Sequence, residues 1–578
     1  MTVMVKYISC LLFVMFGALY NVNAQDYLIS TPNTSLLLTA KPGEAARIHY
    51  YGTRIEENRI QQIFDSNLAF HSESYPAFGI YSYNDKAMQV THGDGNMSLD
   101  LAVESVKQYT VAEAEITEIL LKDKVYPFFV KQCYKAYKNS DVIGTWVEVT
   151  NQEKKPVTMY KFASAFIPVR RGDNWLTHFH GTWGAENMLQ EERLTDGQKI
   201  IKNEDGVRNT TNENPSFMLT LDGKPQEETG HVFGASLAWS GNYTLKLDVD
   251  NNRIIKIYAG INEDASYYTL DPKKTFVTPE FAMTYSTTGK GGVSRNFHRW
   301  ARMYKLSHAD SDRDILLNSW EGVYFKVDQE VMAQMMKDMS QLGGELFVMD
   351  DGWFGDKYPR DGGSTSLGDW VVCKKKLPQG IEGLIASAKK CGIKFGLWIE
   401  PEMVNSKSEL YEKHPDWIIC QDNRTPTTGR GGTQMILDLS NPKVQDFVFG
   451  VVDNLMTNYP EIAYIKWDAN ASIMNYGSYY LPKDRQSHLY IEYHKGLNNV
   501  LERIRTKYPH LLMQACASGG SRVNYGLLPY FGEFWTSDNT DAYQRIYMQW
   551  GVSNFYPAIA MASHVSADKN HQTGRRTP

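Results

Sequence analysis

One stretch decides the fold, and it reads Tyr464-Ile465-Lys466-Trp467-Asp468-Ala469-Asn470. This short apolar run ends in charged residues. A strand that is buried on both faces avoids ionisable groups, because an unpaired buried charge is costly. Asp468 lies at the end of the run, and Lys466 lies two residues back on the same face. If similar strands surround this one, the pattern places the nucleophile of a barrel enzyme at a strand's C-terminal end.

Similar runs recur through the C-terminal half of the chain. They begin at Ile315, Leu346, Phe395, Ile462, Leu511, Phe534 and Ala558. Helical patterns lie between several of them, and one such helix begins at Asp328, places Val331, Met332, Met335 and Met339 on one face, and ends at Gly343. Repeating strand–helix units predict a parallel sheet covered by helices. About seven of them in series favour a (β/α)8 TIM-type barrel, over residues 313–578, instead of an open doubly wound sheet.

The N-terminal half has a different texture. Residues 25–292 show short apolar runs broken by Gly and Asn clusters, with no long helical period. Such spacing predicts a large antiparallel β-sandwich. An amphipathic helical pattern over residues 293–312 is interpreted as a linker between the two domains.

The start of the chain predicts export. Lys6 precedes an apolar run from Ile8 to Phe16, and small residues at 22–24 offer a cleavage point, so residues 1–24 are interpreted as a secretory signal peptide. The mature protein is therefore expected to be secreted or periplasmic. Five cysteines follow, odd in number and without a CxxC pair, so neither a disulfide framework nor a zinc site is expected. The net charge of -6 gives no indication of a nucleic-acid partner.

Polar residues follow nearly every apolar run of the predicted barrel. Six successive ends of this kind indicate a polar pocket at the top face of the barrel. Carboxylates are the most frequent residues at these ends, and tryptophans come next. Glycoside cleavage requires both: one carboxylate attacks, another protonates the leaving oxygen, and aromatic rings pack against the sugar. The sequence has no glycine fingerprint for a dinucleotide or a P-loop, so no cofactor and no metal is expected.

Six motifs carry a resemblance to a known family. They are Asp350-Asp351-Gly352-Trp353-Phe354-Gly355, Leu367-Gly368-Asp369-Trp370, Glu400-Pro401-Glu402-Met403, His414-Pro415-Asp416-Trp417, Lys466-Trp467-Asp468-Ala469-Asn470 and Trp535-Thr536-Ser537-Asp538. In these motifs the chain resembles glycoside hydrolase family 36, the bacterial α-galactosidases. The similarity covers most of the mature chain and is strongest from residue 315 to residue 575.

The resemblance implies roles for individual residues. It makes Asp468 the nucleophile and Asp538 the general acid/base. It also implies a set of substrate-binding residues. Asp350 and Asp351 would bind the axial 4-OH and the 6-OH of galactose, and the Cys-x-x-Gly element of Cys516 and Gly519 would lie beside the 2-OH. Other contacts with the sugar would come from Trp398, Arg430, Lys466 and Asn470.

Simple electrostatics agrees with these roles. Lys466 is expected to keep Asp468 ionised, since a nearby opposite charge lowers the pKa of a carboxyl group. Asp538 must instead hold its proton near neutral pH, and an apolar setting near Trp535 is expected to help. Asp541 is the rival for the acid role.

The chain departs from the family pattern in two places. Family members often place an aspartate of the N-terminal domain in the sugar site, and Ser82 occupies that position here. Trp183 is the more plausible contributor from that domain. After the seventh apolar run the chain stops at Pro578, so we expect a barrel without its last strand and without the C-terminal β domain of the family.

The predicted function is that of a retaining exo-α-galactosidase acting on oligosaccharides or polysaccharide side chains, in a possible homo-oligomer. The alternatives are an α-N-acetylgalactosaminidase, a transferase of the raffinose-synthase type and a non-catalytic carbohydrate-binding protein. Cys516 to Gly519 argues against the first of these, because a bulky N-acetyl group needs space where this loop contacts the 2-OH.

Overall fold

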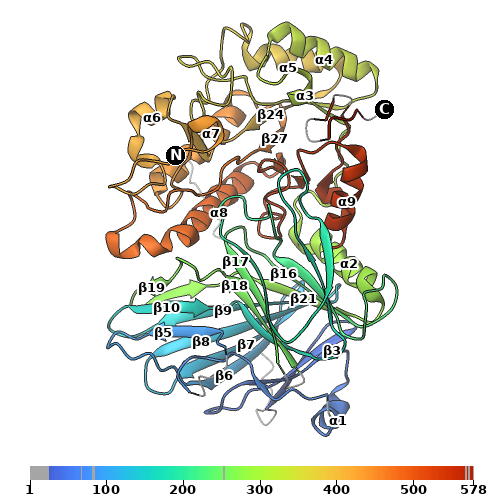
Figure 1. The fold of residues 1–578 in the computed structure, drawn as a ribbon, viewed down its shortest axis with the longest axis vertical. Helices are drawn as coiled ribbons and strands as arrows, with labels where there is room; N and C mark the ends of the chain where they lie inside the picture. The colour runs from blue at the N-terminus through green and yellow to red at the C-terminus, as the bar shows by residue number, and fades with distance from the viewer. Residues whose placement is uncertain are drawn as a thin grey trace, which may run out of the picture.

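The chain folds into two lobes, an antiparallel β lobe and an α/β lobe (Figure 1). The computed structural model describes residues 25–66, 68–80, 85–250, 254–566, 569–570 and 573–576. The predicted signal peptide and Ser82 lie outside the described residues. Among the described residues, no helix has the length and apolarity needed to cross a membrane.

One large antiparallel sheet is the main element of the N-terminal lobe. Its strands pair in the order β13 (Leu189–Arg193), β12 (Trp175–Phe179), β15 (Ser216–Thr220), β16 (Val232–Leu237), β21 (Phe281–Ser286), β9 (Val142–Asn151), β8 (Phe128–Tyr137), β7 (Ala114–Asp123) and β6 (Leu101–Thr110), with β20 (Lys274–Val277) beside β9. Alternate side chains of β9 point to opposite faces: Val147 and Val149 are buried, whereas Glu148 is half-exposed.

Three smaller sheets complete this lobe and pack with the large one. Their strands are β1 (Asp26–Ser30), β2 (Thr34–Thr39), β3 (Arg47–Thr53) and β4 (Ser72–Glu73); β19 (Tyr268–Leu270), β10 (Val157–Phe162) and β5 (Met88–Thr91); and β11 (Ala165–Arg170), β18 (Ile254–Ile261), β17 (Tyr243–Val249) and β14 (Gly197–Asn203). A single apolar cluster joins side chains of all four sheets. The predicted sandwich architecture is confirmed.

The connecting helix begins earlier than the sequence pattern predicted. Helix α2 (Gly289–Trp300) starts before residue 293 and buries Phe297 and Trp300 against the sheet. Its first turn is rich in glycine, which hides the helical period from a sequence reading. Gly289 has φ of +68° and lies so close to the Glu227 carbonyl that a Cβ atom would come within 2.5 Å of it.

Seven parallel strands form the sheet of the C-terminal lobe. In pairing order they are β22 (Leu316–Asn318), β23 (Leu346–Met349), β24 (Lys394–Ile399), β27 (Ile462–Trp467), β28 (Leu512–Ala515), β29 (Glu533–Trp535) and β30 (Met561–Ala562). They match the seven predicted apolar runs, and strand follows strand as in a TIM-type barrel. Within the described residues β22 and β30 are the edge strands, and no eighth strand pairs with either.

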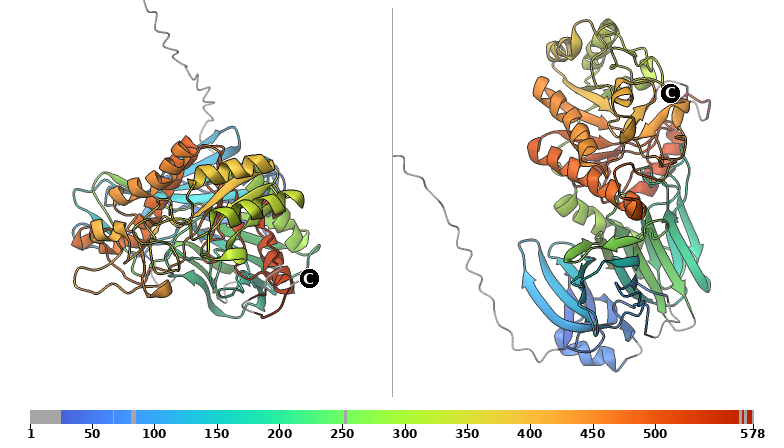
Figure 2. Two further views of the ribbon diagram at one scale, coloured as in Figure 1. Left: turned by 90° about the horizontal axis from the view of Figure 1, so that it is seen from above. Right: turned by 90° about the vertical axis from the view of Figure 1, so that its left-hand side faces the viewer.

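Helices cover the outer face of this sheet, as Figures 1 and 2 show from different sides. The longer ones are α4 (Gln329–Gln341), α5 (Gly380–Cys391), α7 (Pro442–Asn458), α8 (Leu489–Lys507) and α9 (Ala542–Ser553). Asp328 begins α4 as predicted, because its side chain accepts the N–H groups of Glu330 and Val331. The predicted inner face is wrong in part: Val331 is exposed, and Met336 is buried instead.

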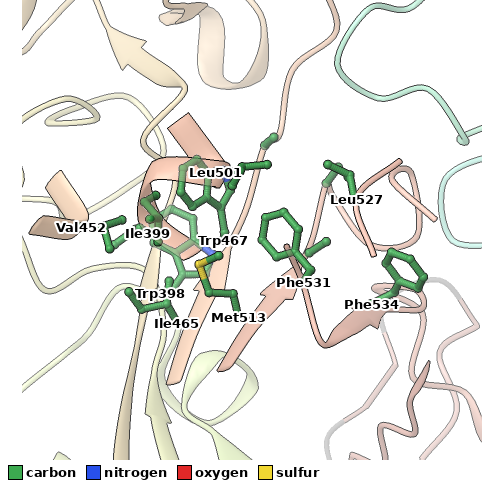
Figure 3. Packing of buried hydrophobic residues seen from close by; sticks show 14 of the residues in the cluster. Trp398, Ile399, Val452, Ile465, Trp467, Leu501, Met513, Leu527, Phe531 and Phe534 are labelled. Carbon is green, nitrogen blue, oxygen red and sulfur yellow. The ribbon is translucent and has the colours of Figure 1, made fainter. Parts of the chain in front are cut away.

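The core beneath the strand ends is built around Trp467, which is fully buried (Figure 3). The Phe531 ring meets it edge-on at 6.2 Å between centroids. The indole N–H of Trp467 donates to Oε1 of Glu402 over 2.8 Å, and Arg522 pairs with both oxygens of that carboxylate. The last residue of β27 is thus anchored by packing and by a buried ion pair, which fixes the backbone that continues into Asp468.

Candidate active site

A cavity of about 830 Å³ opens at the C-terminal ends of the barrel strands. Its volume suits an oligosaccharide fragment. Its wall contains five of the residues predicted for the site, and these are Trp183, Arg430, Lys466, Asn470 and Asp538. The other predicted residues lie in the shell beneath it or beside it, as the contacts below show.

Asp468 follows β27 and is 7% exposed. Its Oδ1 accepts the backbone N–H groups of Ala469 and Ser518 at 2.9 and 3.2 Å, and its Oδ2 accepts the indole N–H of Trp398 at 3.2 Å. Burial has the largest effect and raises the pKa of this carboxyl group. The charges of Lys466 and Arg430, with hydrogen bonds from Asn470 and Cys516, together outweigh it, so the net pKa lies below the usual value. Asp468 is therefore an anion held in a fixed orientation.

Lys466 is the buried cation of the site. Its ammonium lies 2.8 Å from Oδ2 of Asp350 and 4.5 Å from the centroid of the Trp535 ring. Burial lowers the pKa of Lys466, yet the adjacent Asp350 and Asp468 raise it to a net value above normal. Asn318, at the end of β22, donates to the same Asp350 oxygen at 2.7 Å. Three strand ends thus meet at the carboxylate of Asp350.

Asp351 is held by Arg360. The guanidinium is fully buried and donates to both carboxylate oxygens, at 2.9 and 2.8 Å. Such a two-point contact fixes the plane of the carboxylate. Arg360 also donates to Asn405 at 3.0 Å. The sequence reasoning missed Arg360, because it lies in the long loop after β23, where no periodic pattern marks a single arginine.

Asp538 follows β29 on the opposite side of the cavity and is half-buried. The indole N–H of Trp535 donates to its Oδ1 at 3.0 Å, and that of Trp183 donates to its Oδ2 at 3.2 Å. The predicted apolar setting is therefore wrong, because both oxygens have polar partners. Trp183 comes from the N-terminal lobe, so the two lobes build the site together.

Asp541, the rival for the acid role, is a helix cap. It begins α9, where its Oδ1 accepts the N–H of Gln544 at 3.1 Å. Its Oδ2 accepts the Thr573 hydroxyl at 2.8 Å and the guanidinium of Arg575 at 3.0 Å. These contacts engage Asp541 outside the cavity wall.

Cys516 and Gly519 shape the turn after β28. Cys516 is buried, and burial together with the charge of Asp468 raises the pKa of its thiol well above the usual value. Gly519 has φ of +95°, and a Cβ atom there would lie 2.7 Å from the backbone nitrogen of Asp538. The turn brings Ser518 against both Asp468 and Asn470, whose side-chain oxygen accepts the Ser518 hydroxyl at 2.6 Å. This element therefore links the two catalytic candidates.

Glu400, at the end of β24, is a buried acid that sequence reasoning left without a role. Its Oε1 accepts the N–H of Asn470 and the Gln434 amide, the latter at 2.8 Å. Burial, with the charge of Asp468 added, raises the pKa of Glu400 to about 8. Burial thus favours the neutral form of Glu400 beside the anionic Asp468. The position of Glu400 at a strand end is the sequence feature that could have marked it as a site residue.

Arg430 faces the carboxylates from the cavity wall. Burial lowers the pKa of its guanidinium, but four acids raise it to a net value above normal: Glu400, Asp468, Asp351 and Asp538. No metal-binding group of three or more His, Cys, Asp or Glu residues occurs in the part of the chain that the structure describes. Arg430 and Lys466 are two of the cations that offset the charge of these acids.

Further wall residues were not among those predicted for the site: one lies in the other lobe, four come at the end of the first apolar run or after it, and three follow later strands. They are Arg208, Asn318, Trp320, Glu321, Tyr324, Met474 and Ser518, with His564 after β30. Asn318 ends an apolar run, so the signal that marked the other strand ends was present there too.

Comparison with known proteins agrees with this geometry. The model of the glycosyl hydrolase family 36 N-terminal domain matches residues 44–271, and the Melibiase model matches residues 275–578. The chain is 35% identical over 520 residues to α-galactosidase AgaA of Geobacillus stearothermophilus, covering 87% of this chain and 70% of the relative. It is 33% identical over 580 residues to α-galactosidase Mel36A of Lactobacillus acidophilus, covering 96% and 78%.

Solved structures give the same answer. The crystal structure of the family 36 α-galactosidase AgaB from Geobacillus stearothermophilus superposes with a TM-score of 0.90 at 33% identity, over 97% of this chain and 80% of that one. The chain spans 64% of the length of the probable α-galactosidase G of Emericella nidulans. Both family models, the relatives and the fold agree, and the chain therefore belongs to the α-galactosidases of glycoside hydrolase family 36.

Proposed function

We propose that this chain hydrolyses terminal α-galactosyl residues with retention of configuration, using Asp468 as nucleophile and Asp538 as general acid/base. One observation carries the proposal. Asp538 lines an oligosaccharide-sized cavity, and Asp468, from another strand end, lies beside the wall residues Lys466 and Asn470. Asp468 lies deep and is kept anionic, whereas Asp538 is half-exposed in the wall where a leaving group departs.

The chemistry proceeds in two displacements. In the first, a carboxylate oxygen of Asp468 forms a bond to the anomeric carbon while the glycosidic C–O bond breaks. Asp538 transfers its proton to the departing oxygen. In the second, water attacks the anomeric carbon, Asp538 takes a proton from that water, and the bond to Asp468 breaks. Two inversions give net retention.

The surrounding residues support sugar binding. Lys466, Asp350 and Arg430 offer a donor, an acceptor and a fork of donors for ring hydroxyls. Trp535 and Trp183 present indole rings beside Asp538. Variants of the relative AgaA have been crystallised in complex with raffinose and with stachyose. We propose galactosides of this kind as substrates.

A kinetic comparison tests the proposal. The wild type is expected to hydrolyse nitrophenyl α-galactoside. The β-anomer and the α-N-acetylgalactosaminide should each react at least about a hundred-fold more slowly, a ratio that corresponds to about 2.7 kcal/mol. Nuclear magnetic resonance of the first product should show the α-anomer of galactose. Asp468→Ala should abolish turnover, and added azide should restore release of nitrophenol with β-galactosyl azide as product. Release of β-galactose first would overturn the mechanism.

We also propose that the mature protein acts outside the cytoplasm. The support is the sequence of residues 1–24, with Lys6, an apolar run and small residues before Gln25. Fractionation of cells that express the whole chain, with N-terminal sequencing of the product, tests this. A homo-oligomer is a further proposal, which sedimentation of residues 25–578 tests.

A further inference from the structure

Glu186 is a buried acid of the N-terminal lobe that none of the steps above uses. It lies in the loop between β12 and β13, three residues after Trp183, and its side chain is fully inaccessible to solvent. A lone buried carboxyl group is costly unless it is paired. The hydrogen-bond partners of the Glu186 carboxyl group lie in the other lobe.

Its contacts converge on the segment that carries Asp538. The hydroxyl of Ser537 donates to Oε2 of Glu186 over 2.6 Å, and the N–H of Gly520 lies 3.4 Å from Oε1. The same loop accepts a 2.8 Å hydrogen bond from the side chain of Asn539 at the Gly184 carbonyl. Residues 537 and 539, on both sides of Asp538, are thus held by the N-terminal lobe.

The turn after β28 is shaped to admit this side chain. A Cβ atom at Gly519 would lie 2.6 Å from Oε1 of Glu186, so only glycine leaves room for the carboxyl group. Behind the segment, Arg545 of α9 donates to the Ser537 carbonyl over 2.8 Å. Ser537 is therefore held at its hydroxyl group by Glu186 and at its carbonyl oxygen by Arg545.

Charge adds to this geometry. Burial and, to a smaller extent, the charge of Asp538 raise the pKa of Glu186, whereas the Ser537 hydrogen bond lowers it, and the net value is about 7. The charged groups that interact with this cluster are Asp538, Arg545 and, beyond Arg545, Glu321. Glu186 therefore lies close enough to Asp538 for the two carboxyl groups to interact.

We propose that Glu186 is a positioning residue for the general acid/base, supplied to the barrel by the N-terminal lobe. It aims the carboxyl group of Asp538 by fixing Ser537, the residue that precedes it. The inference rests on the proposed function of Asp538.

Two substrates with different leaving groups test it. Raffinose needs protonation of its leaving oxygen, whereas 2,4-dinitrophenyl α-galactoside does not, so only raffinose reports on the acid through kcat/KM. Glu186→Ala should lower kcat/KM for raffinose by about a hundred-fold and for the aryl galactoside by no more than about three-fold. Glu186→Gln keeps the shape and a side-chain oxygen that can accept the Ser537 hydroxyl. It should therefore keep kcat/KM for raffinose within about ten-fold of the wild type.

Controls separate this role from folding. Glu228→Gln, in an exposed position of the same lobe, should leave kcat/KM for both substrates unchanged. If Glu186→Ala does not fold, Ser537→Ala removes the same contact and should show the same selectivity for raffinose. Equal losses on both substrates would overturn the proposal, and so would a Glu186→Gln variant that loses as much activity on raffinose as Glu186→Ala. A wild type that cleaves neither substrate would instead refute the proposed function.

Discussion

The ammonium of Lys466 lies 2.8 Å from Oδ2 of Asp350, an acid two strands away in the barrel sheet. Lys466 therefore stabilises two carboxylates at once: Asp350 by direct contact and Asp468 through its field. The barrel's strand ends are joined at this point by charge as well as by hydrogen bonds along the sheet.

Replacement of Lys466 by Met tests this double role. The change leaves two buried carboxylates without their cation, so we expect the free energy of unfolding to fall by about 3 kcal/mol. It also removes the charge that lowers the pKa of Asp468. Because Asp468 must be ionised to attack, the acidic limb of the kcat/KM profile should move to higher pH. Denaturant titration and a pH series measure the two effects, and an unmoved acidic limb would contradict the second.

Glu400→Gln separates stability from catalysis. The pKa of Glu400 is raised to about 8 in the folded chain, well above that of an unfolded glutamate, about 4.3. A group with a raised folded pKa contributes full stability below its unfolded pKa and loses that contribution as pH rises through the folded value. Glutamine does not titrate, so the variant should gain stability relative to the wild type between pH 5 and pH 8.

Denaturation at pH 5 and at pH 8 measures this gap. The glutamine side chain resembles the neutral acid, and we expect the activity of the Glu400→Gln variant at pH 7 to stay within about ten-fold of the wild type, or about 1.4 kcal/mol. A gap that does not widen with rising pH would show that Glu400 is already ionised in the folded protein.

The ion pair of Glu402 with Arg522 beneath Trp467 should be far more important for stability than a surface pair. Both partners are buried, and Arg522 donates to each oxygen at 2.8 Å. Glu402→Gln leaves the guanidinium uncompensated and should cost about 3–5 kcal/mol. Asp446→Asn breaks the exposed pair with Arg503 and should cost less than about 1 kcal/mol. Guanidinium titration of both variants compares them directly, and equal losses would refute the argument.

Gly519→Ala should damage the site more than the fold. Its Cβ atom would lie 2.6 Å from Glu186 and 2.7 Å from the Asp538 backbone, so both must shift. We expect kcat/KM to fall at least about a hundred-fold, or about 2.7 kcal/mol. Gly392→Ala is the matched control, since Gly392 also has a positive φ, of +72°, but nothing lies within 4 Å of its Cβ position. That control should lose about 1 kcal/mol of stability and keep its activity.

Sequence patterns predicted the barrel well for a physical reason. Parallel strands are buried on both faces, so they read as apolar runs, and all seven runs became strands. The same rule placed Asp350, Asp468 and Asp538 at strand ends. The spacing of apolar residues alone could not show that Val331 of α4 is exposed. A helix rich in methionine has several faces that fit the same apolar spacing.

What the sequence could not predict depends on distant contacts. Nothing near Asp538 in the sequence shows that Trp183, 355 residues away, donates to it. Arg360 and Glu186 acquire their partners only when loops and lobes pack. Each of them is a single charged residue in a loop, and from the sequence alone such a residue resembles an ordinary solvated group.

The contribution of the N-terminal lobe has a consequence for evolution and engineering. Trp183 and Glu186 meet the barrel at the acid/base segment, so the lobes are not interchangeable modules. A chimera that joins this barrel to the sandwich of another family member exchanges part of its catalytic machinery, even if every barrel residue is retained. Recombination between relatives should thus be tolerated within a lobe more often than at the junction, and directed evolution of this scaffold has to select both lobes together.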